Sequence, residues 1–135
     1  VCQDVCPYTK AAKQAEEPAL IPEKIENAYP SLDWLLSMSE EAFRVTYRGT
    51  PVPRTKRRGL ARNAAVALGN VGSEADIPTL INALGTHDEP LVRGHAAWAL
   101  GKIGGRQAFE ALNRSRRQDP DGSVVEEVNA ALSPR

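Results

Sequence analysis

Apolar residues recur every three or four positions along most of the chain, which is the spacing of one face of an α-helix. The clearest stripe is formed by Ile77, Leu80, Ile81 and Leu84. Comparable stripes cover residues 60–72, 91–104, 108–112 and 124–132, with two shorter ones at 31–37 and 39–47. These periods predict an all-α fold.

Two of these stretches are copies of each other. The segment 60–72 lines up with 91–104 when Leu60 is set on Leu91, which gives Arg62 and Arg93 equivalent positions. A weaker third copy, 124–132, lines up with 92–100. Helical pairs of this length cannot bury their apolar faces alone, so they stack into an α-solenoid with one continuous core. The pattern resembles short HEAT-like repeats.

Small residues support close helix packing. Alanine occurs 19 times and aromatic residues make up only 5% of the chain, which argues against a β-sandwich or barrel. We expect Trp98 to pack between repeats and Arg93 to pair with an acid of a neighbouring helix. Left-handed or tight geometry at the end of each first helix is expected from Gly69, Gly72, Gly101, Gly104 and Gly105.

The N-terminal part of the chain, 1–56, is organised differently from the rest. Four prolines dot the segment 1–30, which indicates an extended connector with one short helix near 10–17. Ser39, followed by two glutamates, has the features of a helix N-cap. We expect residues 1–30 to be a connector, 31–56 a helical linker with a basic segment, and 57–135 the repeat domain.

Charge is strongly segregated although the net charge is zero. Residues 1–43 carry −5 and residues 74–135 carry −2, whereas residues 44–73 hold seven bases and no acid. This excess predicts either an anionic partner, foremost nucleic acid, or acids that the fold brings in from elsewhere. The candidate phosphate contacts are Arg44, Arg48, Arg54, Lys56, Arg57, Arg58 and Arg62, together with His95. A buried, satisfied histidine is the alternative for His95.

Length and composition narrow the class of protein. With 135 residues and 41% hydrophobic content, the chain can form one compact core. Its longest apolar run, 64–68, is far below the roughly 20 residues that cross a bilayer, so we expect no membrane association. No phosphate-loop or zinc-protease motif is present, and His87 and His95 are the only histidines. By itself the chain is expected to be catalytically inert.

Both cysteines lie close to the start of the chain. Cys2 and Cys6 have the C-x3-C-P spacing that closes bacterial ferredoxin-type motifs, in which thiolates bind [4Fe–4S] clusters. Two cysteines cannot hold a four-iron cluster alone, and the chain begins with valine, so we expect a fragment whose remaining ligands lie upstream. Two incidental thiols or a local disulfide are compatible with the same spacing.

Five ordered segments carry a more specific resemblance: residues 2–10, 36–44, 47–54, 56–70 and 91–101. Together they resemble the C-terminal part of the epoxyqueuosine reductase family over essentially the whole chain. One departure is Thr9, where the family usually has asparagine, and it puts the turn after Cys6 in doubt.

The resemblance implies a HEAT-like α-solenoid behind an irregular connector from a ferredoxin-like cluster domain. The family is a bacterial cytoplasmic oxidoreductase that uses cobalamin and two [4Fe–4S] clusters to reduce epoxyqueuosine to queuosine in tRNA. Cys2 and Cys6 would then be cluster ligands, and the repeats would help to hold the anticodon region of the tRNA. The cobalamin site and the catalytic acid would lie upstream, and the protein would be a monomer.

Two other functions are compatible with the same residues. A HEAT-like interaction module of a lyase or scaffold would use the basic segment to meet an acidic protein. A ferredoxin-like electron carrier with a helical extension would need upstream cysteines but no affinity for tRNA.

Overall fold

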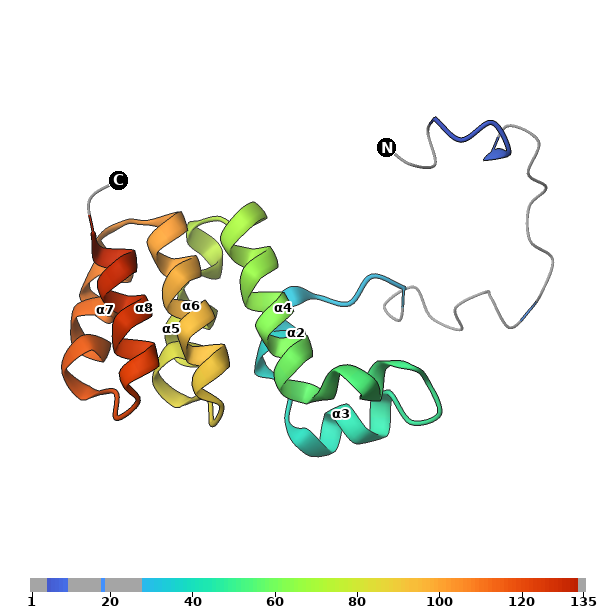
Figure 1. Ribbon diagram of the computed structural model, residues 1–135, viewed down its shortest axis with the longest axis horizontal. Coiled ribbons are helices and arrows are strands. Elements are labelled where there is room, and N and C mark those ends of the chain that lie inside the picture. Colours follow the sequence, from blue (N-terminus) through green and yellow to red (C-terminus); the bar gives the residue numbers. More distant parts are fainter. Residues whose placement is uncertain (1–4, 10–17, 19–27, 134–135) are drawn as a thin grey trace. The chain divides into compact units, whose positions relative to one another are not determined.

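The computed structural model describes residues 5–9, 18 and 28–133, and the chain divides into two compact units, 1–30 and 31–135. Its described helices are α2 (Leu32–Ser37), α3 (Glu40–Thr46), η3 (Val52–Thr55), α4 (Lys56–Val71), η4 (Glu74–Asp76), α5 (Ile77–Thr86), α6 (Pro90–Ile103), α7 (Arg106–Gln118) and α8 (Gly122–Leu132) (Figure 1). The predicted all-α class is confirmed. The helix predicted near 10–17 lies outside the described residues.

The second unit is a two-layer helical stack. Helix α6 packs against α4 on one side and α8 on the other, and α2, α5 and α7 form the layer behind them (Figure 1). The start of α4, the α5–α6 connection and the α7–α8 connection lie along the same edge of this stack. We call this side the loop edge. Within the described part of the chain, no helix has the length and apolarity needed to cross a membrane.

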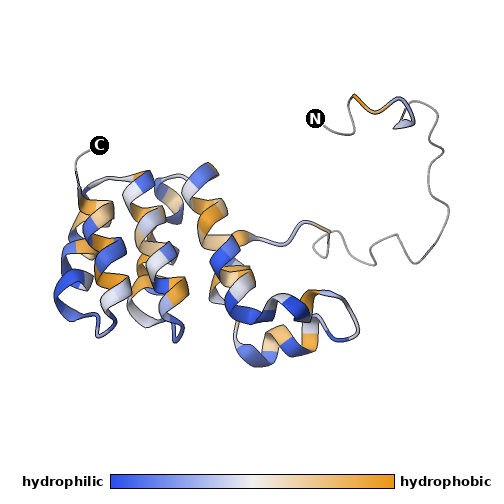
Figure 2. Cartoon of the chain, viewed as in Figure 1, coloured by the Kyte–Doolittle hydropathy of each residue, from blue (hydrophilic) through white to orange (hydrophobic). Residues whose placement is uncertain are grey.

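The core follows the predicted stripes. Its largest fully buried side chains are Leu36, Leu80, Val92, Leu100, Val124 and Val128. Alanines such as Ala61, Ala65 and Ala96 fill the remaining interior positions with no exposed surface. Hydrophobic and hydrophilic segments alternate along each helix, as one buried face requires (Figure 2).

The glycines have two different roles. Gly104 and Gly105 follow α6 with φ of 77° and 91°, which confirms the predicted left-handed ending there. Gly72 ends α4 with φ of −71° and ψ of 169°, and a Cβ there would clash with the Leu68 carbonyl oxygen, so the predicted tight geometry is found at this position. The prediction was wrong for Gly69 and Gly101, which lie inside helices and let the next helix approach closely.

That close approach also sets the repeat register. A Cβ on Gly69 would lie 3.0 Å from the Ala99 Cα, and one on Gly101 would lie 3.0 Å from the Ala131 Cα. These two contacts are equivalent, so Gly101 corresponds to Gly69 and Ala131 to Ala99. The register predicted from Leu60 was therefore wrong by one position.

The corrected register separates Arg62 from Arg93. Arg93 Nε donates to Asp119 Oδ2 at 2.8 Å, which confirms the predicted pairing with an acid beside an adjacent helix. Arg62 does not hold the equivalent position, and its Nε is buried with no hydrogen-bond partner among the described residues. Trp98 packs against Gly69, as expected of an inter-repeat contact.

Candidate nucleic-acid interface

Helix α4 begins with three cations, Lys56, Arg57 and Arg58, and its first turn contains no acid. The preceding Thr55 makes no side-chain capping bond. Cations at a helix N-terminus face the positive end of the helix dipole, which costs roughly 0.3–1 kcal/mol each. The arrangement opposes helix stability and favours a bound anion.

Lys56 adds backbone strain at the same place. Its φ of 57° and ψ of 159° make it the one non-glycine residue with positive φ in the described part of the chain. Such a conformation costs on the order of 1–3 kcal/mol and concentrates at functional sites. The strain therefore coincides with the start of the cation cluster.

Arg57 lies inside a network of internal bonds. Its Nε donates to Glu40 Oε2 at 3.1 Å, one terminal nitrogen donates to both carboxylate oxygens of Asp88, and its side chain is only 10% exposed. Burial lowers the pKa of Arg57, but the bonds to Asp88 and Glu40 outweigh it and raise the pKa above its ordinary value. Of the predicted phosphate contacts, Arg57 is thus the one whose charge is already satisfied within the fold.

His87 completes this network. Its Nε2 lies 3.0 Å from the Arg57 guanidinium, and its Nδ1 lies 3.1 Å from the backbone nitrogen of Glu89. The side chain is 6% exposed. Burial first, and then the nearby Arg57 charge, lower the pKa of His87 below its ordinary value. The ring is therefore neutral at pH 7.

A surface cleft gathers several of the other predicted cations. Arg44, Lys56 and Arg58 line it, and Glu40 and Glu89 supply two acids. We call this site the basic cleft. Arg58 is loosely paired with Glu89 at 3.9 Å, whereas Arg44 and Lys56 form no ion pair with any described residue. The cleft therefore keeps exposed, uncompensated positive charge.

The remaining predicted contacts lie around or away from the basic cleft. Arg48, in the turn after α3, and Arg54, in η3, are exposed nearby in sequence. Arg62 is half-buried on α4. His95 is half-buried on α6, where its Nδ1 lies 2.8 Å from the Leu91 carbonyl, and it lines a different hollow. The structure does not bring His95 into the basic cleft.

A second basic cluster was missed by the sequence reasoning. Arg114, Arg116 and Arg117 lie on the last turns of α7 and are exposed. The R-S-R-R run signals this cluster, but the net −2 charge of residues 74–135 concealed it.

Cys6 is the candidate cluster ligand that the structure describes, while Cys2 lies outside the described residues. Hydrogen bonds from the Tyr8 backbone and the Thr9 side chain hold the pKa of the Cys6 thiol below its ordinary value. A thiolate is the form that binds iron, so Cys6 fits a cluster ligand chemically. The described residues contain no group of three or more His, Cys, Asp or Glu side chains that could hold a metal.

The family model for HEAT repeats matches residues 55–133. The chain belongs to the HEAT-repeat family. Over nearly its whole length, this HEAT-repeat chain is also homologous to the C-terminal part, about 35%, of epoxyqueuosine reductases. The predicted resemblance is thereby confirmed.

Individual relatives show the extent of this homology. Epoxyqueuosine reductase of Bacillus anthracis is 35% identical over 131 residues, which cover 97% of this chain and 34% of that protein. The Escherichia coli enzyme is 35% identical over 100 residues, covering 73% of this chain and 26% of that protein. The HEAT-repeat chain thus spans about a third of the length of the curated relatives it matches.

Solved structures agree with the sequence matches. A crystal structure of epoxyqueuosine reductase with an epoxyqueuosine-modified tRNA stem loop matches with a TM-score of 0.86 and 29% identity. The match covers 97% of this chain and 35% of that one. The structure of the Bacillus subtilis enzyme matches equally well.

Proposed function

We propose that this chain is the HEAT-repeat part of an epoxyqueuosine reductase and that its basic cleft binds the phosphate backbone of tRNA near the anticodon. The observation that carries the proposal is the gathering of exposed cations in the basic cleft at the strained, uncapped start of α4, where Arg44 and Lys56 form no ion pair with any described residue. A fold selected for stability alone would place acids there. The homologous structure with a tRNA stem loop supports tRNA as the anion.

Each predicted cation has its own place in this proposal. Lys56, Arg58 and Arg44 contact phosphates in the basic cleft, with Arg48 and Arg54 at its margin. Arg57 positions them by fixing α3 and α4 against the α5–α6 connection. Such contacts hold and orient the RNA without reading its sequence. Arg62 and His95 lie outside the cleft, and we assign them no phosphate.

The chemistry of the reaction belongs to the whole parent protein. Cys2 and Cys6 would bind [4Fe–4S] clusters together with cysteines from other parts of that protein, and the clusters would pass electrons. No residue described here is assigned to cobalamin. We infer that the parent works in the bacterial cytoplasm as a monomer and that this chain alone has no reductase activity.

Charge reversal in the basic cleft tests the proposed function. We expect Lys56→Glu combined with Arg58→Glu to weaken binding of an anticodon stem-loop RNA at least tenfold at low salt, because two phosphate contacts are lost. The two residues are exposed, so circular dichroism should show an unchanged helical fold.

Arg106→Glu is the control for a charge reversal outside the cleft. Arg106 is 88% exposed at the start of α7, where an acid suits the helix dipole, and it lies outside the basic cleft. Its reversal changes the net charge without touching the cleft, so RNA affinity should change little. Equal affinity of the double variant and this control would contradict the proposal. If the double variant binds RNA like the parent chain but loses binding to an acidic protein, the chain is a protein-interaction module.

A further inference from the structure

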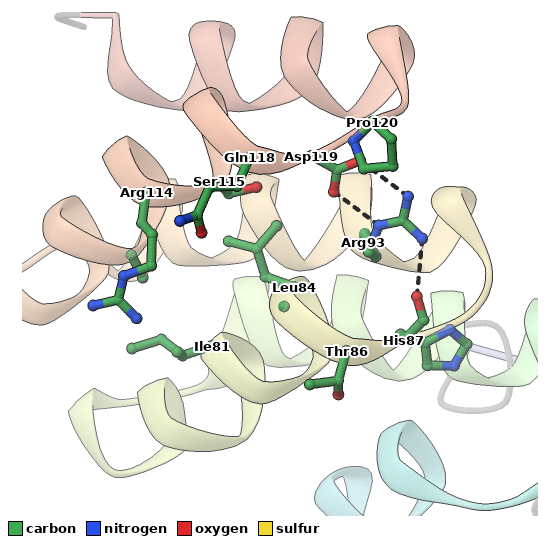
Figure 3. A pocket seen from close by; sticks show the side chains of 12 residues that line it. Ile81, Leu84, Thr86, His87, Arg93, Arg114, Ser115, Gln118, Asp119 and Pro120 are labelled. Atoms are coloured by element: carbon green, nitrogen blue, oxygen red, sulfur yellow. Dashed lines mark hydrogen bonds and ion pairs between the residues drawn. The ribbon is translucent and has the colours of Figure 1, made fainter.

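A groove between α5 and α7 opens beside the loop edge. It has a volume of about 350 Å³, within the roughly 300–1,000 Å³ of sites that hold a small molecule. Both walls are mixed: α5 contributes Ile81, Leu84 and Thr86, and α7 contributes Ala111, Arg114 and Gln118 (Figure 3). Its size is sufficient for a sugar–phosphate unit.

The groove also has polar side chains. Thr86 and Gln118 line it, and Arg114 lies at the opposite end from the Arg93–Asp119 pair (Figure 3). The Oγ of Ser115 is buried without a hydrogen-bond partner among the described residues, so a ligand in the groove cannot reach it. The exposed Arg114 guanidinium is the donor available to a phosphate oxygen.

The charge around the groove is positive. Arg114, Arg116 and Arg117 are exposed and form no ion pair with any residue that the structure describes. The acids nearest in the sequence are occupied: Glu110 is paired with Arg106, Asp119 is paired with Arg93, and Asp121 accepts from the Ser123 backbone. Cations near a helix C-terminus interact favourably with the helix dipole, which explains why α7 can end in three arginines. The dipole does not explain the open groove beside them.

Position connects this groove with the basic cleft. The C-terminal end of α7 and the start of α4 lie on the same loop edge, separated by α6 (Figure 1). Packed helices are about 8–10 Å apart, so the two sites are separated by roughly 16–20 Å. Neighbouring phosphates of one strand cannot reach both sites, so several nucleotides bridge this distance.

We propose that the α5–α7 groove is a second phosphate-binding site, in which Arg114 holds a backbone phosphate of the same RNA that occupies the basic cleft. The inference rests on the proposed function. It adds a second anchor several nucleotides away from the first.

The test uses Arg114→Gln combined with Arg117→Gln, and Arg106→Glu on the same helix as the control. With a stem-loop RNA, we expect the double variant to bind three- to tenfold more weakly and to lose one to two phosphates from its salt dependence. With a trinucleotide, which cannot reach both sites, the α7 variants should bind like the parent chain in the basic cleft.

Three outcomes would overturn the inference, and they are distinguishable. If Lys56→Glu/Arg58→Glu weakens stem-loop binding but the α7 variants do not, the groove does not bind a phosphate and the proposed function is unaffected. If neither set of variants weakens stem-loop binding, both the groove site and the proposed function are wrong. If the α7 variants lose affinity only for an acidic polypeptide such as polyglutamate, the groove is a protein-binding site.

Discussion

Lys56 holds its φ of 57° without the freedom of glycine. Replacing it by glycine removes the clash of Cβ with the backbone and also removes one cation of the basic cleft. We expect Lys56→Gly to raise the free energy of unfolding by about 1 kcal/mol while weakening RNA binding several-fold. Urea unfolding and an RNA titration of the same sample measure both. A variant that is less stable than the parent would show that the backbone at Lys56 is not strained.

Arg57 and Arg58 are adjacent in sequence but differ in burial. Arg57→Met removes a 10% exposed guanidinium with several internal bonds, whereas Arg58→Met removes a 51% exposed one with a single loose pair. We expect losses of about 1–3 kcal/mol for Arg57→Met and under about 0.5 kcal/mol for Arg58→Met. Denaturant unfolding compares them, and equal losses would contradict the assigned roles.

His87 predicts a pH dependence of stability. Its pKa in the fold lies below the roughly 6.5 of an unfolded histidine, so the unfolded chain binds more protons as pH falls below 6.5. Stability should therefore be complete above pH 6.5 and decrease as pH falls toward the pKa of the folded state. His87→Gln should lose this part of the slope between pH 7 and 5. Identical slopes in the variant and the parent would exclude His87 as the cause.

Helix contacts depend on where the small residues lie. A Cβ on Gly69 would lie 2.9 Å from the Trp98 Cε3 and 3.0 Å from the Ala99 backbone, whereas one on Gly85 in α5 would meet nothing within 4 Å. We expect Gly69→Ala to destabilise the fold by about 1–3 kcal/mol and Gly85→Ala to stabilise it by up to about 1 kcal/mol. Thermal unfolding should separate the two, and an equally tolerated Gly69→Ala would refute the close contact of α4 with α6.

The sequence predicted elements better than their register. The helical period identifies helices such as α5 from Ile77 to Leu84, because burial of one face is a local property. Setting Leu60 on Leu91 matched two arginines but displaced the other identities by one position. A spacing of 32 residues, the same that relates 92–100 to 124–132, aligns Gly69 with Gly101 and the alanines before them in the sequence itself. The contacts of these two glycines with the next helix agree with that spacing.

The candidate site was predictable in part, because the local concentration of charge can be read from the sequence. An acid-free stretch is visible along the chain, and it correctly indicated where positive charge concentrates. Which cations are neutralised depends on acids distant in sequence, such as Asp88, which pairs with Arg57 from the α5–α6 connection. The strain at Lys56 has no sequence signal at all, because lysine seldom adopts positive φ.

At the scale of the whole molecule, zero net charge conceals a chain with a basic edge. Asp88 and Asp119 each neutralise one buried arginine, which leaves the exposed cations of α4 and α7 as the surplus on the loop edge. The HEAT stack holds these cations at fixed positions. We therefore propose that the repeats support the phosphate contacts.

The most direct test of this account is titration of the chain with an unmodified tRNA anticodon stem loop across a range of salt concentrations. We predict that log affinity falls linearly with log salt, with a slope of about −0.7 to −0.9 for each phosphate neutralised and several phosphates in total. No binding at low salt, or an affinity that does not change with salt, would contradict the claim that the HEAT repeats grip RNA through its backbone.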